Sequence, residues 1–193
     1  MTTLKAEPET RNPSADTASA GAKVRLSDLL VDCSIEIAPT SAKKIKAFGD
    51  DLAAGSKVYV VSPVGRDFAD IVSTAKALRN EGFEPVPHVA ARSIRDRGQL
   101  EENLRQLRDD ADVTEVLVIG GDRSRPVGAF DSSLQLLETG LFGKYGIRRI
   151  GVAGHPEGHP SVSDDVLLDA LHQKKRVRGE IWCRVFRGYA VLL

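Results

Sequence analysis

The sequence predicts an α/β fold in which parallel strands alternate with helices along the chain. Five short apolar or β-branched runs lie between residues 32 and 153, and apolar residues at helical spacing follow each run. Helices that connect successive strands require parallel pairing and right-handed crossovers. Two architectures satisfy this pattern: an open doubly wound sheet and part of a (β/α)8 barrel. A whole barrel takes roughly 250 residues, and this chain has 193, so an intact barrel does not fit.

Each element has its own signal. The strands are predicted at residues 32–37, 57–61, 84–89, 115–119 and 149–153, where KVYVV and EVLVI are the clearest runs. Helical stripes are predicted from Ile45 to Leu52, Phe68 to Leu78, Leu100 to Ala111, around Leu134 and Leu137, and from Val162 to Leu171. Gly82 and Gly140 follow two of these stripes as stop signals, and Ser161 or Ser163 opens the last one.

Composition excludes several classes of protein. The 41% hydrophobic content supports a core, and no run approaches the roughly 18 apolar residues of a membrane span. Lys and Arg total 27, as do Asp and Glu, so the basic excess of a dedicated nucleic-acid binder is missing. Cys33 and Cys183 are too few and too far apart for a zinc site or a disulfide scaffold. We expect a cytoplasmic protein.

The two ends differ from the middle. Residues 1–23 are rich in Thr, Ser, Ala, Pro and Glu, without the apolar stretch of a secretory signal, and are predicted to be a disordered tail. From Lys174 onward six residues are basic and one is acidic. The simplest interpretation of this segment is a basic helix end followed by a strand at residues 181–186. A basic tail that binds RNA or a membrane is the alternative, but the segment is too short to specify it.

Chemistry-bearing side chains cluster where strands end. Glu36, His88 and Asp122 lie at or just after the first, third and fourth strands, and His155 and His159 follow the fifth. The carboxyl ends of parallel strands share one edge, which is where ligands bind in such folds. Each residue alone has an ordinary structural explanation, as a surface carboxylate, a satisfied histidine or a turn residue. Their shared edge favours a functional site.

Two motifs at this edge allow several interpretations. Gly120-Gly121-Asp122 lacks the continuation of a dinucleotide fingerprint. It fits a phosphate-binding turn of a small-molecule kinase, or a tight turn that lets a flat cofactor approach the backbone. In the segment HPEGH, Pro156 and Gly158 disfavour the helix that would bring both histidines onto one metal. We therefore predict no metal site, and expect a loop with two imidazoles beside a polar ligand.

Together these residues resemble the methylenetetrahydrofolate reductase family of flavin-dependent TIM barrels, from about Asp32 to Lys174. The segment SIEIAP, with Glu36, resembles the family's first-strand S-F-E-F-F-P-P. The other matching motifs are Pro87-His88 of the third strand, Gly120-Gly121-Asp122 for R-G-D of the fourth, Phe130-Asp131-Ser132 for Y-A-S, and His155-Pro156-Glu157-Gly158-His159-Pro160 for Y-P-E-x-H-P. The departures at Ala38, Gly120 and His155 indicate a divergent branch.

The resemblance implies a (β/α)8 TIM-barrel type, incomplete at about five to six βα units, with residues 24–175 as the flavin-binding catalytic domain. It implies FAD as cofactor and NAD(P)H as electron donor, without indicating NADH or NADPH. The cofactor-binding residues that it implies are His88, Gly120, Gly121, Asp122, Phe130, Asp131, Ser132, His155, His159 and Lys174. The family's later folate-contacting T-Q-F motif has no counterpart, and residues 176–193 are interpreted as an atypical, basic and apolar tail, the product of a truncation or a shifted reading frame.

The implied reaction reduces 5,10-methylenetetrahydrofolate to 5-methyltetrahydrofolate in one-carbon and methionine metabolism. Glu36 would act as the neutral acid that protonates the folate ring nitrogen, with Ile35, Ile37 and Val60 expected to bury it. Asp122 would stabilise the developing cation. Two alternatives stay open. One is a phosphate-binding α/β enzyme of the kinase type. The other is a non-catalytic remnant, whose unpaired strand edges would favour homo-oligomers.

Overall fold

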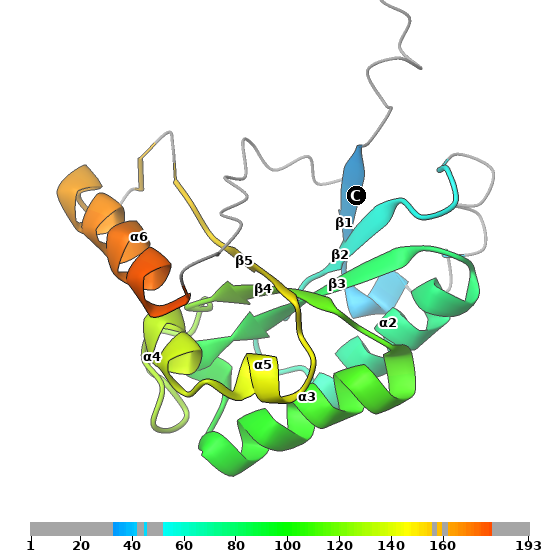
Figure 1. The fold of residues 1–193 in the computed structure, drawn as a ribbon, viewed down its shortest axis with the longest axis horizontal. Helices are drawn as coiled ribbons and strands as arrows, with labels where there is room; N and C mark the ends of the chain where they lie inside the picture. Colours follow the sequence, from blue (N-terminus) through cyan, green and yellow to red (C-terminus); the bar gives the residue numbers. More distant parts are fainter. Residues whose placement is uncertain (1–32, 42–44, 46–51, 156–157, 160–161, 179–193) are drawn as a thin grey trace, which may run out of the picture. The chain divides into compact units, whose positions relative to one another are not determined.

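We describe the fold from a computed structural model, which places residues 33–41, 45, 52–155, 158–159 and 162–178 (Figure 1). All of these residues belong to one compact unit that spans Asp32–Leu193. The predicted tail at 1–23 and residues 179–193, which include the predicted sixth strand, lie outside the described residues. So does most of the helix predicted between Ile45 and Leu52.

The described chain alternates strand and helix as the sequence predicts. The strands are β1 (Ser34–Ile37), β2 (Lys57–Val60), β3 (Glu84–Ala90), β4 (Glu115–Ile119) and β5 (Arg149–Val152). The helices are α2 (Phe68–Asn80), α3 (Arg97–Ala111), α4 (Ser133–Glu138), α5 (Leu141–Lys144) and α6 (Asp164–Arg178), and a 3-10 turn, η2 (Ala91–Ser93), follows β3. All five strands end within one residue of their predicted carboxyl end.

The five strands form one parallel sheet in the order β1-β2-β3-β4-β5. This confirms the prediction that the strands are parallel and consecutive. A doubly wound sheet would instead reverse its strand order partway, with later strands added beside the first. The architecture is therefore an α/β sheet whose neighbours in sequence are also its neighbours in space.

Side chains alternate between the two faces of the sheet, and the helices pack on one of them. Val58 and Val60 of β2 pack with Ile71 and Leu78 of α2. Val116 and Val118 of β4 lie in a larger cluster with residues of α3, α4, α5 and β5. The opposite face carries a small cluster of Tyr59, Val86 and Leu117. Figure 1 shows α2, α3 and α5 together on one side of the sheet.

Two prolines shape the middle of the sheet. The backbone N–H of Glu84 donates to the carbonyl of Ser56, which precedes β2. The backbone N–H groups of even-numbered residues of β3 therefore point toward β2, and those of odd-numbered residues point toward β4. Pro85 and Pro87 are odd-numbered and have no N–H to donate. The ladder between β3 and β4 accordingly begins only at His88, whereas β3 pairs with β2 from Glu84 to Pro87. The two halves of the sheet therefore meet in the middle of β3.

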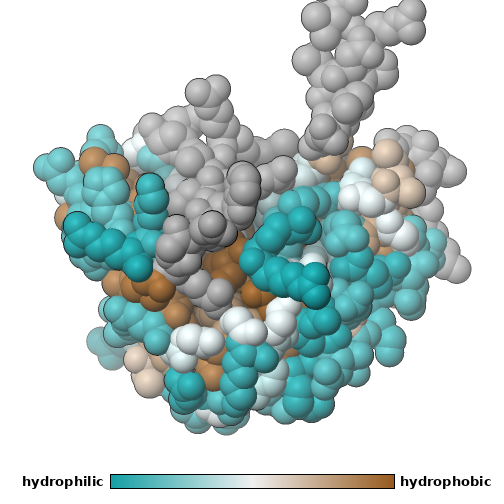
Figure 2. Space-filling view, viewed as in Figure 1, coloured by the Kyte–Doolittle hydropathy of each residue, from teal (hydrophilic) through white to brown (hydrophobic). Residues whose placement is uncertain are grey.

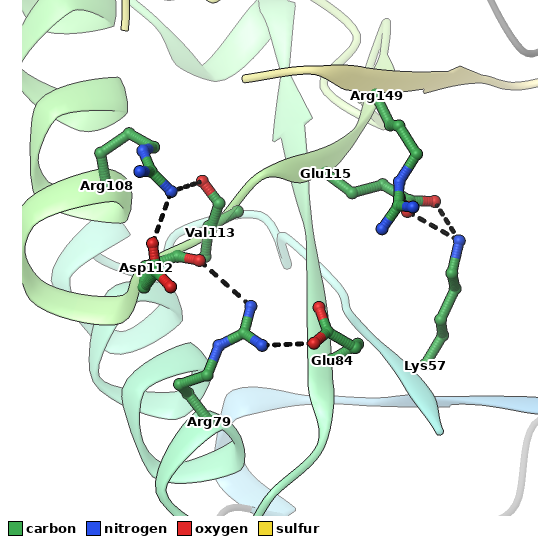
Figure 3. A network of polar contacts seen from close by, with 8 residues as sticks. All are labelled: Lys57, Arg79, Glu84, Arg108, Asp112, Val113, Glu115 and Arg149. Atoms are coloured by element: carbon green, nitrogen blue, oxygen red, sulfur yellow. Dashed lines mark hydrogen bonds and ion pairs between the residues drawn. The ribbon is translucent and has the colours of Figure 1, made fainter. Parts of the chain in front are cut away.

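An ionic network occupies the amino-terminal edge of the sheet (Figure 3). The Glu115 carboxylate accepts from Lys57 Nζ at 2.8 and 2.7 Å and lies 2.6 Å from Arg149 Nε. Its side chain is only 11% exposed. Lys57 and Glu115 belong to β2 and β4, so their contact spans β3 on the face away from the helices. The network ties β2, β4 and β5 together at the edge opposite the candidate site.

Nearby arginines hold the end of α3. Asp112 ends this helix with a left-handed backbone, at φ +46°, which is uncommon for a residue other than glycine. Arg108 Nη1 donates to the Asp112 carboxylate at 2.7 Å and to the Val113 carbonyl at 3.1 Å. Arg79 of α2 bridges from Glu84 Oε1, at 2.6 Å, to the Asp112 carbonyl. These contacts fix the turn that leads into β4.

No helix within the described ranges is long and apolar enough to cross a membrane. Figure 2 shows that the visible face is mostly hydrophilic, with hydrophobic residues gathered at α6 and between α6 and α4. Val166, Leu168 and Val177 are the exposed large apolar residues of α6.

Candidate functional site

The carboxyl ends of β1 and β3 bring Glu36 and His88 together. Glu36 Oε2 lies 3.4 Å from His88 Nε2, across β2, and both side chains are on the face away from the helices. His88 is 6% exposed, and its Nε2 has no hydrogen-bond partner within the described part of the chain. Tyr59 of β2 packs edge-on against the imidazole, with ring centroids 6.2 Å apart. The Glu36 side chain is 21% exposed, so solvent or a ligand can reach it.

One expectation about Glu36 is wrong. Ile35, Ile37 and Val60 do not bury it, because all three pack in the cluster under α2, on the opposite face of the sheet. Successive side chains of a strand point to opposite faces, so the neighbours of Glu36 in sequence cannot also be its neighbours in space. His88 and the sheet face around Tyr59 form its surroundings instead.

A pocket of about 370 Å³ lies beside the ends of β4 and β5 and against α6. It falls at the lower end of the roughly 300–1,000 Å³ typical of ligand clefts. The polar residues and glycines that line it are Arg92, Gly120, Gly121, Asp122, Asp131, Ser132, Ser133, Gly154, His155, His159 and Lys174. Ile119, Leu167 and Leu171 are among the apolar lining residues. The pocket thus combines an apolar wall with charges of both signs.

Most of the residues singled out in the sequence line this pocket, and three do not. Phe130 is buried in the large core cluster with α3 and α4, so it supports the loop rather than the pocket wall. Glu36 and His88 form their own pair at the ends of β1 and β3. Asp122, His155 and His159 share the pocket, so the five residues predicted to share one edge form two groups, each at strand carboxyl ends.

The glycine pair after β4 permits a close approach of two loops. Gly121 has φ +90°, and a Cβ on it would lie 3.0 Å from Ala90 Cβ at the end of β3. The Gly120 carbonyl accepts from the backbone N–H of Arg92 at 2.9 Å. A side chain at position 121 would therefore push β3 and β4 apart where they form the pocket wall.

Arg92 is a lining residue that the sequence analysis missed. It lies in η2, and its Nε donates to the Asp131 carbonyl at 3.0 Å and to the Asp131 carboxylate at 2.9 Å. Its Nη1 donates to the Arg123 carbonyl at 3.2 Å. Its position just after the third strand was an available signal, since Glu36, His88 and Asp122 were singled out for such positions.

The loop after β4 is held in place by backbone contacts with the loop after β3. Val127 N–H donates to the Arg92 carbonyl at 3.0 Å, and Ala129 N–H donates to the Arg95 carbonyl at 2.8 Å. Gln135 then accepts from the N–H of Asp131 at 2.6 Å and closes the start of α4. These bonds present Asp131 and Ser132 to the pocket on a supported backbone.

Two histidines and a lysine occupy the other wall. The rings of His155 and His159 meet edge to face, with centroids 5.0 Å apart. Burial first, and then electrostatic interaction with His159 and Lys174, lowers the pKa of His155 below its ordinary value of 6.5. His155 is therefore a neutral imidazole at pH 7 that can donate or accept a hydrogen bond. Within the described ranges, no group of three or more His, Cys, Asp or Glu side chains could hold a metal ion.

No protein-family model matches the chain.

Proposed function

We propose that this chain is a flavin-dependent oxidoreductase of the methylenetetrahydrofolate reductase type. The single observation that carries the proposal is the position of Glu36 and of the pocket lined by Asp122. Both lie at the carboxyl ends of strands in one consecutive parallel sheet. A reductase of this type needs its flat cofactor and its acid at the same end of the sheet.

The fold supports a barrel of the (β/α)8 type, incomplete in the described chain. Right-handed crossovers that always advance to the next strand place every helix on the same face. In the described part, helices pack against the face that carries Val58 and Val116. The opposite face carries long side chains that meet across an intervening strand, Glu36 with His88 and Lys57 with Glu115. Such pairs from alternate strands are the layers that fill a barrel interior.

The pocket fits a flavin nucleotide in its donor set. Lys174 and Arg92 provide positive charge for phosphate groups, and Ser132 provides a hydroxyl donor. The backbone at Gly120 is open, since a Cβ there would meet nothing within 4 Å, so a planar ring can lie against it. Ile119 and Leu171 supply apolar contact. When bound, the flavin would take hydride from NAD(P)H and pass it to the folate.

Glu36 supplies the proton in this proposal. Opening of the folate ring requires protonation of the leaving nitrogen, and Glu36 is a carboxyl at this edge that a substrate can reach, at 21% exposed. His88, with Nε2 3.4 Å from the carboxylate, would orient it once the two groups form a hydrogen bond. Asp122 holds a negative charge in the pocket wall and would stabilise the iminium cation formed on ring opening. The two carboxylates thus have separate roles in separate surroundings.

The first test is flavin binding by the whole chain. The proposal expects a yellow protein, or quenching of flavin fluorescence when FAD is titrated into the purified chain. ADP retained by a protein that does not bind FAD would favour a phosphate-binding enzyme of the kinase type. Binding of neither ligand would favour a non-catalytic remnant, and would contradict the proposal.

The second test separates the two half-reactions in stopped-flow absorbance. Glu36→Gln should slow oxidation of the reduced flavin by methylenetetrahydrofolate by about 10²–10⁴-fold, because the amide cannot deliver a proton. Reduction of the flavin by NAD(P)H should stay near wild type, since it needs no acid there. The matched control is Glu84→Gln, at the opposite edge of the sheet, where neither step should change. Equal slowing of both steps in Glu36→Gln would contradict the assignment.

A further inference from the structure

We infer that Arg92 is the residue through which this pocket binds a phosphate group of its ligand. The inference rests on the proposed function, because it names the recognition chemistry of the same pocket. It concerns a residue outside the motifs that resemble the reductase family.

Arg92 is held at the pocket wall by its backbone and by its side chain. Its backbone N–H donates to Gly120 and its carbonyl accepts from Val127, so η2 is tied to the loop after β4 on both sides. The guanidinium is fixed by Nε on Asp131 and by Nη1 on the Arg123 carbonyl. Side-chain freedom that would otherwise be lost on binding an anion is therefore already restricted.

The guanidinium keeps donors for a ligand. Within the described residues, Nη2 of Arg92 makes no hydrogen bond, and the side chain is 35% exposed. A guanidinium has five N–H donors in a planar fork, and its Nε and Nη1 bonds leave the Nη2 pair available. Two N–H groups on one nitrogen beside a cleft suit phosphate oxygens, which accept at short range.

The pocket has a cationic side chain on each of two walls, Arg92 on one and Lys174 on the other. Asp131 accounts for one unit of negative charge and is already paired with Arg92. Asp122 is the pocket's other carboxylate among the described residues. The lowered pKa of His155 is caused mainly by burial, to which Lys174 adds. A phosphate placed between the Arg92 wall and the Lys174 wall would meet positive charge on both sides.

The experiment compares flavins with and without phosphate, and phosphate ligands without a flavin. The affinities of FAD, FMN and riboflavin are measured by flavin fluorescence, and those of ADP and inorganic pyrophosphate by calorimetry, for the wild-type chain and three variants. Arg92→Ala should weaken FAD and FMN binding by about 10- to 100-fold, as expected for loss of a charge-assisted hydrogen bond, and leave riboflavin unchanged. Arg92→Lys should recover part of the loss, since it keeps the charge without the fork.

Arg95→Ala is the matched control. Arg95 lies three residues on, is exposed, and bonds to Gln99 rather than lining the pocket. The Arg95→Ala variant should bind all five ligands with the affinity of the wild type. Far-UV circular dichroism of each variant checks that the fold is kept.

The outcomes separate the inference from the proposed function. Equal affinity of the wild type for FAD and riboflavin, or equal weakening of both in Arg92→Ala, would overturn the role of Arg92. Loss of ADP or pyrophosphate binding in Arg92→Ala, in a chain that binds no flavin, would support Arg92 and contradict the flavin proposal. Binding of none of the five ligands would overturn both.

Discussion

Glu115→Gln should destabilise the fold through the network at the amino-terminal edge of the sheet. The substitution keeps the shape of the side chain but removes the charge that pairs with Lys57 and Arg149. Breaking a fully buried ion pair typically costs about 3–5 kcal/mol. Here Glu115 is buried, but Lys57 is 25% and Arg149 50% exposed, so solvent screens both partners. We therefore expect a loss of about 2 kcal/mol.

Urea denaturation followed by circular dichroism measures this loss as a lower midpoint at unchanged slope. In a chain of this size, about 2 kcal/mol corresponds to a fall in Tm of about 4–8 °C. Glu84→Gln is the control. Its ion pair with Arg79 is comparably short but its carboxylate is 38% exposed, so its loss should cost no more than about 1 kcal/mol.

A double-mutant cycle then tests the pairing itself. Lys57→Met should cost less in the Glu115→Gln background than in the wild type, because its partner is already gone. The reasoning fails if Glu115→Gln unfolds within about 0.5 kcal/mol of the wild type, or if Glu84→Gln costs as much as Glu115→Gln.

Three further outcomes are expected. The pKa of His155 is lowered by burial, His159 and Lys174, so NMR should show the imidazole titrating below pH 6.5. Lys174→Met should raise its titration midpoint, and an unchanged midpoint would contradict the coupling. As the pH falls, His155 is protonated in the unfolded state before it is protonated in the folded state. Its contribution to the free energy of unfolding should therefore fall as the pH drops through 6.5 toward the folded-state pKa. Gly128→Ala should prevent soluble folding or lower the free energy of unfolding by more than about 3 kcal/mol. The reason is that the alanine Cβ would lie 1.9 Å from the Arg95 carbonyl oxygen. A near-normal Tm would refute that packing. Leu104→Ala should cost about 2–5 kcal/mol in urea denaturation, because Leu104 is fully buried, and a loss under 1 kcal/mol would show that the core can collapse around it.

The strands and their parallel pairing were predictable because their signals are local, whereas their consecutive order was implied only by the family resemblance. Runs such as KVYVV and EVLVI mark buried strands, and intervening helices make their neighbours parallel. The short α5 helix was missed, because a four-residue helix has no period to detect. The first strand begins at Ser34, two residues after its predicted start, and strand boundaries are the least reliable part of such a prediction. Helix α6 begins at Asp164, directly after Ser163, one of the two predicted starts.

Which residues belong to the candidate site could largely be predicted, but how they are arranged in space could be predicted less well. Chain position placed the candidates at strand ends, and that is where Glu36 and Asp122 lie. Contacts that depend on the sheet face were missed. Glu36 was assigned the wrong neighbours because alternation was not applied, and Arg92 was missed because its role depends on Asp131, 39 residues away.

The prolines of β3 have a consequence for how the two parts of the site are aligned. Glu36 belongs to the half of the sheet whose core lies under α2, and the pocket belongs to the half packed on α3, α4 and α5. The β3–β4 ladder starts at His88, so backbone pairing between the halves is confined to the few residues beyond Pro87, while α2 packs on both halves. His88 is thus both the first rung of that ladder and the partner of Glu36. A substitution at His88 would therefore disturb both the pairing of the two halves and the surroundings of Glu36.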